Sequence, residues 1–380
     1  MALTVLLEGD PLAPQQARLG AALAARGHRV LVLNGPRIAA QIRGEFGQAC
    51  QALRALPTWT GGLRTWHLRR LARREGVDVV HLNFLMPPLD AWVEPGMPPV
   101  VATAWGSDIN EEVFPRSARF RAGVDRILRG AAAVTSDSAP ILAIVRARGA
   151  GQPGRPLELV LWSADLSRWR RERCQARALE LRAQWQVPAG APVLLAPRQL
   201  QPHYRTELVV DGFARSRWRD VGVLVLKHHG KGGEDAWLAE VMRRAADLGV
   251  ADRIRTAPRC AYDDLPAVYA AADAAVSAPD ADGVPSTFCE LMALGVPIVA
   301  SDLPAYAGVL DHGTRGLLFR PGDAADLAVQ LDRLLDDSAG RQRMIDDGLQ
   351  WAREHGDWQG SVAAFERLYL DAVARRADVR

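Results

Sequence analysis

Two carboxylates, Asp282 and Glu290, flank a stretch that is typical of a loop leading into a helix. Between them Pro285 and Ser286 are helix-start residues, and Thr287 stands three positions before Glu290, which is the spacing of a capping box. The free N–H groups and the dipole of a helix start favour a bound phosphate. Carboxylates instead accept the hydrogens of hydroxyl groups. The stretch could therefore hold phosphate through its backbone and a sugar through its side chains.

The same residues have a simpler interpretation, in which Glu290 only caps its own helix and Asp282 is a turn residue. The sequence alone leaves the two interpretations open. In either case Gly295 and Pro297 predict the end of the helix, and the β-branched run 298–300 predicts a short buried strand.

Segments with the composition of buried strands alternate with helical segments throughout the chain. This alternation predicts an α/β fold, with parallel sheets that carry helices on both faces. The clearest strand segments are 3–7, 30–33, 77–82, 99–104, 193–196, 223–226 and 274–278. No Gly-x-Gly-x-x-Gly motif follows any of them, so a dinucleotide cofactor is not supported.

Polar and aromatic residues gather where two of these strand segments end. They are His81, Asn83, Trp105, Gly106 and Asp108. Ligands of open α/β sheets bind outside the carboxyl ends of the strands, so these residues are candidates for a ligand site. Asp108 has a second interpretation, as the N-cap of the helix that follows it.

The composition is that of an ordinary globular protein. The chain has 380 residues, enough for two domains, with 48% hydrophobic and 24% charged residues. No apolar run approaches the roughly 18–20 residues of a membrane span. The N-terminus has no basic region, so we expect a first strand there rather than a signal peptide.

Cysteines and charges exclude two further classes of function. The four cysteines have no close spacing, which indicates neither a disulfide framework nor a metal site and fits a cytoplasmic protein. The formal net charge is +3, and nearly all basic residues are arginine. No basic stripe with interleaved aromatic residues is present, so we expect no nucleic-acid partner.

Residues 63–75 are predicted to form a basic amphipathic helix. We expect an apolar face made by Leu63, Trp66, Leu71 and Ala72, opposed by Arg69, Arg70, Arg73 and Arg74. Such a helix either presents a solvated face or makes a weak peripheral contact with an anionic membrane, here the inner membrane face.

The stretch from Asp282 to Ala300 resembles the Glu-x7-Glu signature of retaining glycosyltransferases of family 4. Its tail, Leu-Met-Ala-Leu-Gly-Val-Pro-Ile-Val-Ala, matches well, whereas Asp282 replaces the first Glu and Val284-Pro285 replaces Phe-Gly. The resemblance implies the GT-B fold, in which two Rossmann-like domains with parallel sheets face each other across a cleft. It implies that Glu290 binds the ribose hydroxyls of a nucleotide sugar and that Asp282 faces the transferred sugar.

The resemblance also implies which other residues bind the donor. Arg198 matches the family's Arg after the first strand of the second domain. Tyr204 stands where the family has Lys, so Arg205 is the substitute, and Lys227 or Lys231 could supply a cation instead. The expected donor-binding residues are Gly9, Arg198, Arg205, Lys227, Asp282, Gly283, Val284, Pro285, Ser286, Thr287 and Glu290. Those expected to take part in catalysis are Asp108, Arg198, Arg205 and Asp282.

On the acceptor side the resemblance implies His81, Asn83, Trp105, Gly106 and Asp108. Asn83 and Trp105 stand where the family often has His, whereas Asp108 matches. The expected domains are an acceptor-binding domain over 1–170, a donor-binding domain over 171–356, and a helix over 357–380 that crosses back to the first domain.

The expected function is the retaining transfer of a sugar from a UDP- or GDP-sugar to a small-molecule or lipid-linked glycan acceptor, without a bound metal or other cofactor. Two alternatives remain open. One is a nucleotide-sugar epimerase or a sugar phosphorylase on the same fold, and the other is a non-catalytic partner subunit that binds the donor.

Overall fold

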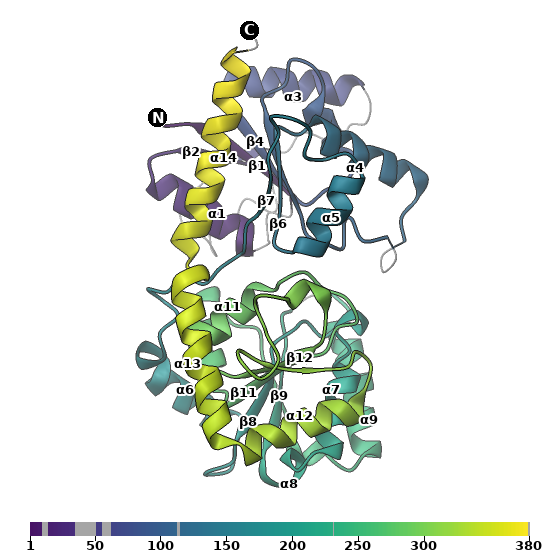
Figure 1. The fold of residues 1–380 in the computed structure, drawn as a ribbon, viewed down its shortest axis with the longest axis vertical. Helices are drawn as coiled ribbons and strands as arrows, with labels where there is room; N and C mark the ends of the chain where they lie inside the picture. Colours follow the sequence, from purple (N-terminus) through teal and green to yellow (C-terminus); the bar gives the residue numbers. More distant parts are fainter. Residues whose placement is uncertain (10–13, 35–50, 55–61, 112–114, 231, 379–380) are drawn as a thin grey trace. The chain divides into compact units, whose positions relative to one another are not determined.

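The computed structural model describes residues 1–9, 14–34, 51–54, 62–111, 115–230 and 232–378 (Figure 1). The chain divides into two compact units. The first, here the N-terminal unit, comprises Met1–Trp162 and Gln359–Arg380. The second, the C-terminal unit, comprises Ser163–Trp358. The chain passes from one unit to the other after Trp162 and after Trp358, near the predicted domain boundaries at 170/171 and 356/357.

The N-terminal unit contains a seven-stranded parallel sheet in the order β3-β2-β1-β4-β5-β6-β7. Its strands are β1 (Thr4–Gly9), β2 (Arg29–Asn34), β3 (Gln51–Arg54), β4 (Val79–Asn83), β5 (Val100–Ala104), β6 (Ala133–Ser136) and β7 (Leu157–Leu159). Its helices are α1 (Pro14–Ala25), α3 (Gly62–Glu75), η2 (Leu89–Val93), α4 (Ala118–Gly130), α5 (Ala139–Ala147) and most of α14 (Trp358–Asp378).

Every residue of β4 and β5 is buried, as expected for central strands that are covered on both faces. On one face, apolar side chains of β1, β4 and β5 form a core with α3, η2 and α4. On the other face, α14 packs close to the sheet, because Tyr369 on this helix bonds to His81 on β4. The C-terminal helix therefore belongs to the N-terminal unit, as predicted (Figure 1).

The C-terminal unit contains a six-stranded parallel sheet in the order β10-β9-β8-β11-β12-β13. Its strands are β8 (Val193–Ala196), β9 (Val223–Lys227), β10 (Ile254–Ala257), β11 (Ala274–Ser277), β12 (Ile298–Ser301) and β13 (Leu317–Phe319). Its α-helices are α6 (Arg171–Gln184), α7 (Thr206–Arg215), α8 (Trp218–Val221), α9 (Glu234–Asp247), α10 (Leu265–Ala270), α11 (Ser286–Ala293), α12 (Ala324–Asp336) and α13 (Ser338–His355). Its 3-10 turns are η3 (Pro202–Tyr204), η4 (Ala251–Arg253), η5 (Tyr262–Asp264) and η6 (Pro304–Tyr306).

Helices cover both faces of this second sheet. Apolar side chains from α7, α9 and α12 pack against β8, β9 and β11 in one core. Elsewhere in the unit α10 packs on α6, and α11 packs on α13. Both sheets are thus parallel with helices on both faces, which confirms the predicted pair of Rossmann-like α/β domains.

The basic helix α3 differs from its predicted pattern. Leu68, Leu71 and Ala72 form its buried face. Leu63 and Trp66, which we expected on that face, are 65% and 52% exposed and share the outer surface with the arginines. Within the described residues, no helix has the length and apolar content needed to span a membrane.

Candidate functional site

The loop between β11 and α11 lies at the carboxyl end of the second sheet, and α11 begins where the sequence predicted a helix start. The N-cap residue, Pro285, has extended backbone angles and makes no side-chain cap bond. Thr287 lies inside the helix rather than at its N-cap, so the predicted capping box of Thr287 and Glu290 is not formed. Glu290 is 3% exposed on the buried side of α11.

A largely buried ion pair joins this loop to the segment after β8. Arg198, two residues beyond β8, donates from Nη2 to Asp282 Oδ2 over 2.8 Å. The same oxygen accepts from the hydroxyl of Tyr306 at 3.3 Å, and Asp282 Oδ1 accepts from the backbone N–H of Gly283 at 3.1 Å. The side chains of Arg198 and Asp282 retain 14% and 15% exposure. Two predicted site residues, 84 positions apart in the chain, are thus in direct contact.

The guanidinium of Arg198 is oriented by more than its carboxylate partner. It lies over the ring of Tyr204, 4.4 Å from the centroid, in a cation–π contact. Burial opposes its charge, but Asp282 and the neighbouring tyrosines outweigh burial and raise the pKa of Arg198. Its Nε is buried and has no hydrogen-bond partner in the protein. Arg198 is therefore a fixed cation whose buried Nε–H has no partner in the protein.

Glu290 lies close to a second tyrosine. The hydroxyl of Tyr269 bonds to the side chain of Thr287, and burial, together with the charge of Glu290, raises the pKa of Tyr269. The first turn of α11 thus brings Thr287 and Glu290 beside Tyr269 at the same end of the sheet that holds Asp282. The predicted donor residues 282–290 form one continuous loop and helix start.

Arg205 has different neighbours from Arg198. It joins η3 to α7 in the left-handed conformation, with φ of 49°. Its Nε donates to Glu207 Oε1 and its Nη1 to Asp280 Oδ2, both over 2.6 Å. Two carboxylates thus share the charge of Arg205 and raise its pKa. Arg205 is consequently tied to the loop after β11 through Asp280.

Lys227 is not the loop cation that the sequence indicated. It is 2% exposed at the end of β9, and its Nζ donates to the backbone oxygens of His228 and Pro258. Burial lowers the pKa of Lys227. We therefore withdraw it as a donor contact. The alternative, Lys231, lies outside the described residues.

A buried acid supports the segment that carries Arg198. Glu234, at the start of α9, is fully buried and accepts from the backbone N–H groups of Leu200 and His229. His229 in turn bonds to the backbone oxygen of Pro197 at 3.0 Å, and burial lowers its pKa to about 4. These bonds fix the chain on both sides of Arg198.

In the N-terminal unit, Gly9, Asn83 and Trp105 meet at neighbouring strand ends. A Cβ on Gly9 would lie 2.5 Å from the backbone oxygen of Asn83, so the close approach of β1 and β4 requires glycine here. Trp105 donates from Nε1 to Asn83 Oδ1 over 2.8 Å and stacks on Trp162 at 4.9 Å. Asn83 and Trp105, which the sequence placed together, are in contact, and Gly9, which was predicted as a donor-binding residue, packs against Asn83.

Asp108 is buried and binds the backbone at the carboxyl ends of β4 and β5. Its Oδ1 accepts from the backbone N–H groups of Trp105 and Gly106, and its Oδ2 accepts from that of Leu85. Burial raises its pKa to about 6 against the effect of these bonds. Asp108 caps its own turn rather than the next helix, which Ser117 caps. It therefore positions Trp105 and Gly106.

His81 is placed in the interior rather than at an open strand end. It is fully buried, with Nδ1 bonded to the hydroxyl of Tyr369 at 2.6 Å and Nε2 to that of Thr103 at 2.7 Å. Thr103 bonds in turn to Thr135 at 2.7 Å. Burial lowers the pKa of His81 to about 3, so it is neutral at pH 7. Both ring nitrogens are occupied, and we withdraw His81 as an acceptor contact.

One buried acid has no counterpart in the sequence predictions. Glu8, beside Gly9 on β1, accepts from Arg64 Nη2 at 3.1 Å and from Trp92 Nε1. Burial raises its pKa to about 7, and Arg64 pulls the pKa in the opposite direction. Its place at the carboxyl end of β1 was the signal that could have identified it.

The tyrosines around Arg198 and Glu290 were also missed. Tyr204 adjoins Arg205 in the sequence, but Tyr269 and Tyr306 lie on separate segments whose local patterns indicate only packing. Tyr306 follows β12, so the rule that sites lie at carboxyl ends could have found it. Among the described residues no group of three or more His, Cys, Asp or Glu is placed to hold a metal ion.

Two models of sugar-transferring enzymes match most of the chain. Residues 12–160 match the family model described as a glycosyl transferase 4-like domain, and residues 178–351 match that of glycosyl transferases group 1. The chain therefore belongs to the glycosyltransferases of family 4, which have the GT-B fold.

Curated relatives match only part of the chain. A D-inositol 3-phosphate glycosyltransferase of Corynebacterium efficiens is 30% identical over 194 residues, which cover 50% of this chain and 46% of that protein. An MMP alpha-(1->4)-mannosyltransferase of Mycolicibacterium hassiacum is 34% identical over 133 residues, 35% of this chain and 32% of that protein. The chain thus matches less than half the length of these relatives.

Solved structures match over nearly the whole chain. Sucrose-phosphate synthase from Thermosynechococcus elongatus has a TM-score of 0.79 at 20% identity and covers 99% of this chain and 100% of its own. Anabaena Alr3699/HepE in complex with UDP-glucose also has a TM-score of 0.79, at 18% identity, over 98% of this chain and 100% of its own. At these identities the similarity shows the fold.

Proposed function

We propose that this protein transfers a sugar from a UDP- or GDP-sugar to an acceptor with retention of configuration, and that it does so without a bound metal. The observation that carries the proposal is the contact between Arg198 and Asp282 at the loop that leads to Glu290. The names of the curated relatives, which include a glycosyltransferase and a mannosyltransferase, support sugar transfer. The complexes of Alr3699/HepE with UDP and with UDP-glucose support a nucleotide sugar as donor.

In this proposal the C-terminal unit binds the donor. Glu290 accepts the hydrogens of the ribose hydroxyls, and the free N–H groups at the start of α11 meet the pyrophosphate. Arg198 turns its unsatisfied Nε to the same group. Because its guanidinium is already held by Asp282 and Tyr204, it needs little reorganisation as negative charge develops on the leaving phosphate.

Asp282 then has two tasks, holding Arg198 and accepting hydroxyl hydrogens of the transferred sugar. Retention follows if the acceptor attacks from the face that the nucleotide leaves, with the leaving phosphate oxygen taking the acceptor's proton. The bond from sugar to acceptor forms as the bond from sugar to phosphate breaks, so no side-chain nucleophile is needed. A cationic side chain and a helix start also provide the charge compensation for which other transferases use a metal.

On the acceptor side we propose that Trp105 meets the acceptor, with the buried residues Asn83 and Gly106 supporting it from behind. Asp108 holds their backbone in place and does not touch the acceptor itself. The partly exposed indole of Trp105, stacked on Trp162, offers an apolar face to a small-molecule or lipid-linked glycan.

The proposal is tested by incubating the purified chain with a panel of UDP- and GDP-sugars and measuring released nucleotide and product mass. We expect nucleotide release with one donor, undiminished by a chelator. An isomerised donor would instead indicate an epimerase, and release dependent on inorganic phosphate would indicate a phosphorylase. Tight donor binding without turnover would indicate the non-catalytic partner subunit. Loss of activity on chelation, with recovery on adding manganese, would contradict the metal-free reaction.

We also propose that α3 makes a weak peripheral contact with anionic membranes. Leu63 and Trp66 are exposed on this helix, and the guanidinium of Arg70 lies 5.7 Å from the Trp66 ring. An exposed indole beside cationic side chains suits the boundary of an anionic bilayer. Co-sedimentation with phosphatidylglycerol vesicles, but not with phosphatidylcholine vesicles, is expected, and Trp66→Ser should reduce it. Equal sedimentation of Trp66→Ser and the unaltered protein with phosphatidylglycerol vesicles would contradict this contact.

A further inference from the structure

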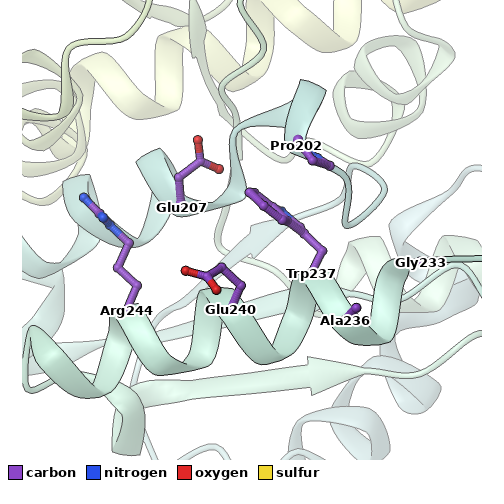
Figure 2. A pocket seen from close by; sticks show the side chains of 7 residues that line it. All are labelled: Pro202, Glu207, Gly233, Ala236, Trp237, Glu240 and Arg244. Atoms are coloured by element: carbon purple, nitrogen blue, oxygen red, sulfur yellow. The ribbon is translucent and has the colours of Figure 1, made fainter.

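A hollow in the C-terminal unit lies between α7 and α9, and none of the predicted donor residues lines it. Its volume is about 430 Å³, and Figure 2 shows the side chains that line it. Trp237, Glu240 and Arg244 come from α9, Glu207 from the first turn of α7, and Pro202 from η3. We refer to this hollow as the α7–α9 pocket. Its volume lies in the range of roughly 300–1,000 Å³ that is usual for small-molecule sites.

The sequence of α9 explains why the pocket has a mixed lining. Trp237, Glu240 and Arg244 are three and four positions apart, so they lie along one side of the helix. Trp237 also packs against the buried core of the unit, which holds its ring in place. Figure 2 shows its indole beside the carboxylate of Glu207, with Glu240 and Arg244 farther along the same helix.

Each charged side chain in the lining already has a counter-ion. Glu207 pairs with Arg205, Glu240 with Arg243, and Arg244 with Asp211. An ionic ligand would therefore find no uncompensated charge, and a wholly apolar ligand would have to cover three charged groups. The lining fits a ligand that is neutral, has hydroxyl groups, and presents an apolar face.

Two polar atoms of the lining residues have no partner in the protein. Nε1 of Trp237 and Oε2 of Glu207 are both buried and both lack a hydrogen bond. The first is a donor and the second an acceptor. Buried polar atoms are nearly always satisfied, so an unsatisfied donor and acceptor beside one hollow point to a missing polar partner.

We propose that the α7–α9 pocket is a second carbohydrate site, which binds a neutral sugar ring. The indole of Trp237 packs on the apolar C–H face of the ring, and its Nε1–H donates to a hydroxyl oxygen. The carboxylates of Glu207 and Glu240 accept hydroxyl hydrogens. The proposal does not depend on the donor assignment, because no residue of the loop 282–290 takes part in it.

Glu207 is unsuitable as the test position, because it also binds Arg205, which the sequence assigns to the donor site. Trp237→Ala and Glu240→Gln are the informative changes. Trp66→Ala is the matched control, because it removes a partly exposed tryptophan from the other unit. The thermal midpoint of each variant shows whether the fold survives, and Glu240→Gln keeps an exposed side chain of the same size.

The measurement is saturation-transfer NMR with methyl α-D-glucopyranoside, methyl α-D-mannopyranoside and methyl α-D-galactopyranoside as probes. Saturating UDP or GDP is present in separate samples to occupy the donor site. We expect transfer to at least one probe under both conditions. Its affinity should fall at least tenfold in Trp237→Ala, fall measurably in Glu240→Gln, and stay unchanged in Trp66→Ala.

Three results would overturn the proposal. One is the absence of transfer to all three probes. Another is transfer of unchanged strength in both Trp237→Ala and Glu240→Gln. The third is transfer that either nucleotide abolishes, which would assign the sugar to the donor site. None of these results bears on nucleotide release from the donor panel, so the two proposals fail separately.

Discussion

The two units place polar side chains at the carboxyl ends of their strands in the same way but use them differently. In the N-terminal unit, every polar side-chain atom of His81 and Asp108 is hydrogen-bonded to another group of the protein. In the C-terminal unit, Arg198 and Asp282 bind each other yet stay partly exposed, and Arg198 retains an unsatisfied Nε. A polar residue at a strand end is therefore not enough to mark a site, because its hydrogen-bonding atoms can all be satisfied inside the protein.

The largest expected effect separates the two arginines of the C-terminal unit. Arg198→Ala should lower kcat about 100- to 1,000-fold, because it removes a preorganised cation from the leaving phosphate. Arg205→Ala should lower kcat by less than about tenfold, because two carboxylates already share the charge of Arg205. Steady-state kinetics on the donor found in the panel measures both, with thermal midpoints as the control for folding.

An equal loss in the two variants would make Arg205 the functional equivalent of Arg198. A larger loss in Arg205→Ala would reverse the assignment of the two cations.

The next effect is on stability and lies in the N-terminal unit. His81→Ala should lower the free energy of unfolding by about 2–5 kcal/mol, because it opens a cavity and removes one hydrogen bond from each of two buried hydroxyl groups, those of Tyr369 and Thr103. Tyr369→Phe, which removes only one of these bonds, should cost about 1 kcal/mol. Urea unfolding measures both, and donor Kd should not change. If His81→Ala raised the KM for the acceptor without lowering stability, His81 would have to be an acceptor contact after all.

Glu8 predicts a pH dependence that can be assigned to one group. Its pKa is about 7 in the folded chain against a usual value of 4.5, so the folded state binds the proton more tightly. This contribution to stability is fully present below pH 4.5 and is lost as the pH rises through 7. Protonated Glu8 thus contributes roughly 3 kcal/mol to the free energy of unfolding below pH 4.5, relative to its ionised form above pH 7.

The control for this prediction is Glu8→Gln, which cannot titrate and still accepts from Trp92. The difference in unfolding free energy between the two proteins isolates Glu8, because other groups such as His81 titrate equally in both. Relative to the variant, the natural protein should lose stability between pH 4.5 and pH 7. A difference that is constant over this range would contradict a raised pKa.

The sequence predicted the fold well because the alternation of apolar strands with helices directly reflects burial on both faces of a parallel sheet. Both sheets and the return of the last helix to the N-terminal unit were predicted in this way. The helix at 63–75 was also predicted, but not its orientation. Leu63 and Trp66 are apolar, yet tertiary packing turned Leu68 inward instead.

The sites were harder to predict because their contacts are long-range. The approach of Arg198 to Asp282 depends on the order of β8 and β11 in the sheet, which the local sequence of neither segment contains. Lys227 was expected to supply a cation to the donor, but it is buried and its ammonium group is bound by two backbone oxygens. His81 looked like a ligand at a strand end until α14 covered it with Tyr369.

The central claim, that the C-terminal unit binds a nucleotide sugar through the helix start after Asp282, is tested most directly by Glu290→Gln. This change keeps the size of the side chain but removes the charge that accepts ribose hydroxyls. Hydrogen bonds to a charged acceptor contribute roughly 1.5–3 kcal/mol, so donor Kd should rise about ten- to hundredfold. Calorimetric titration with the donor, beside the thermal midpoint, gives the answer. A donor Kd that is unchanged in Glu290→Gln would contradict the claim, whatever happens to the midpoint.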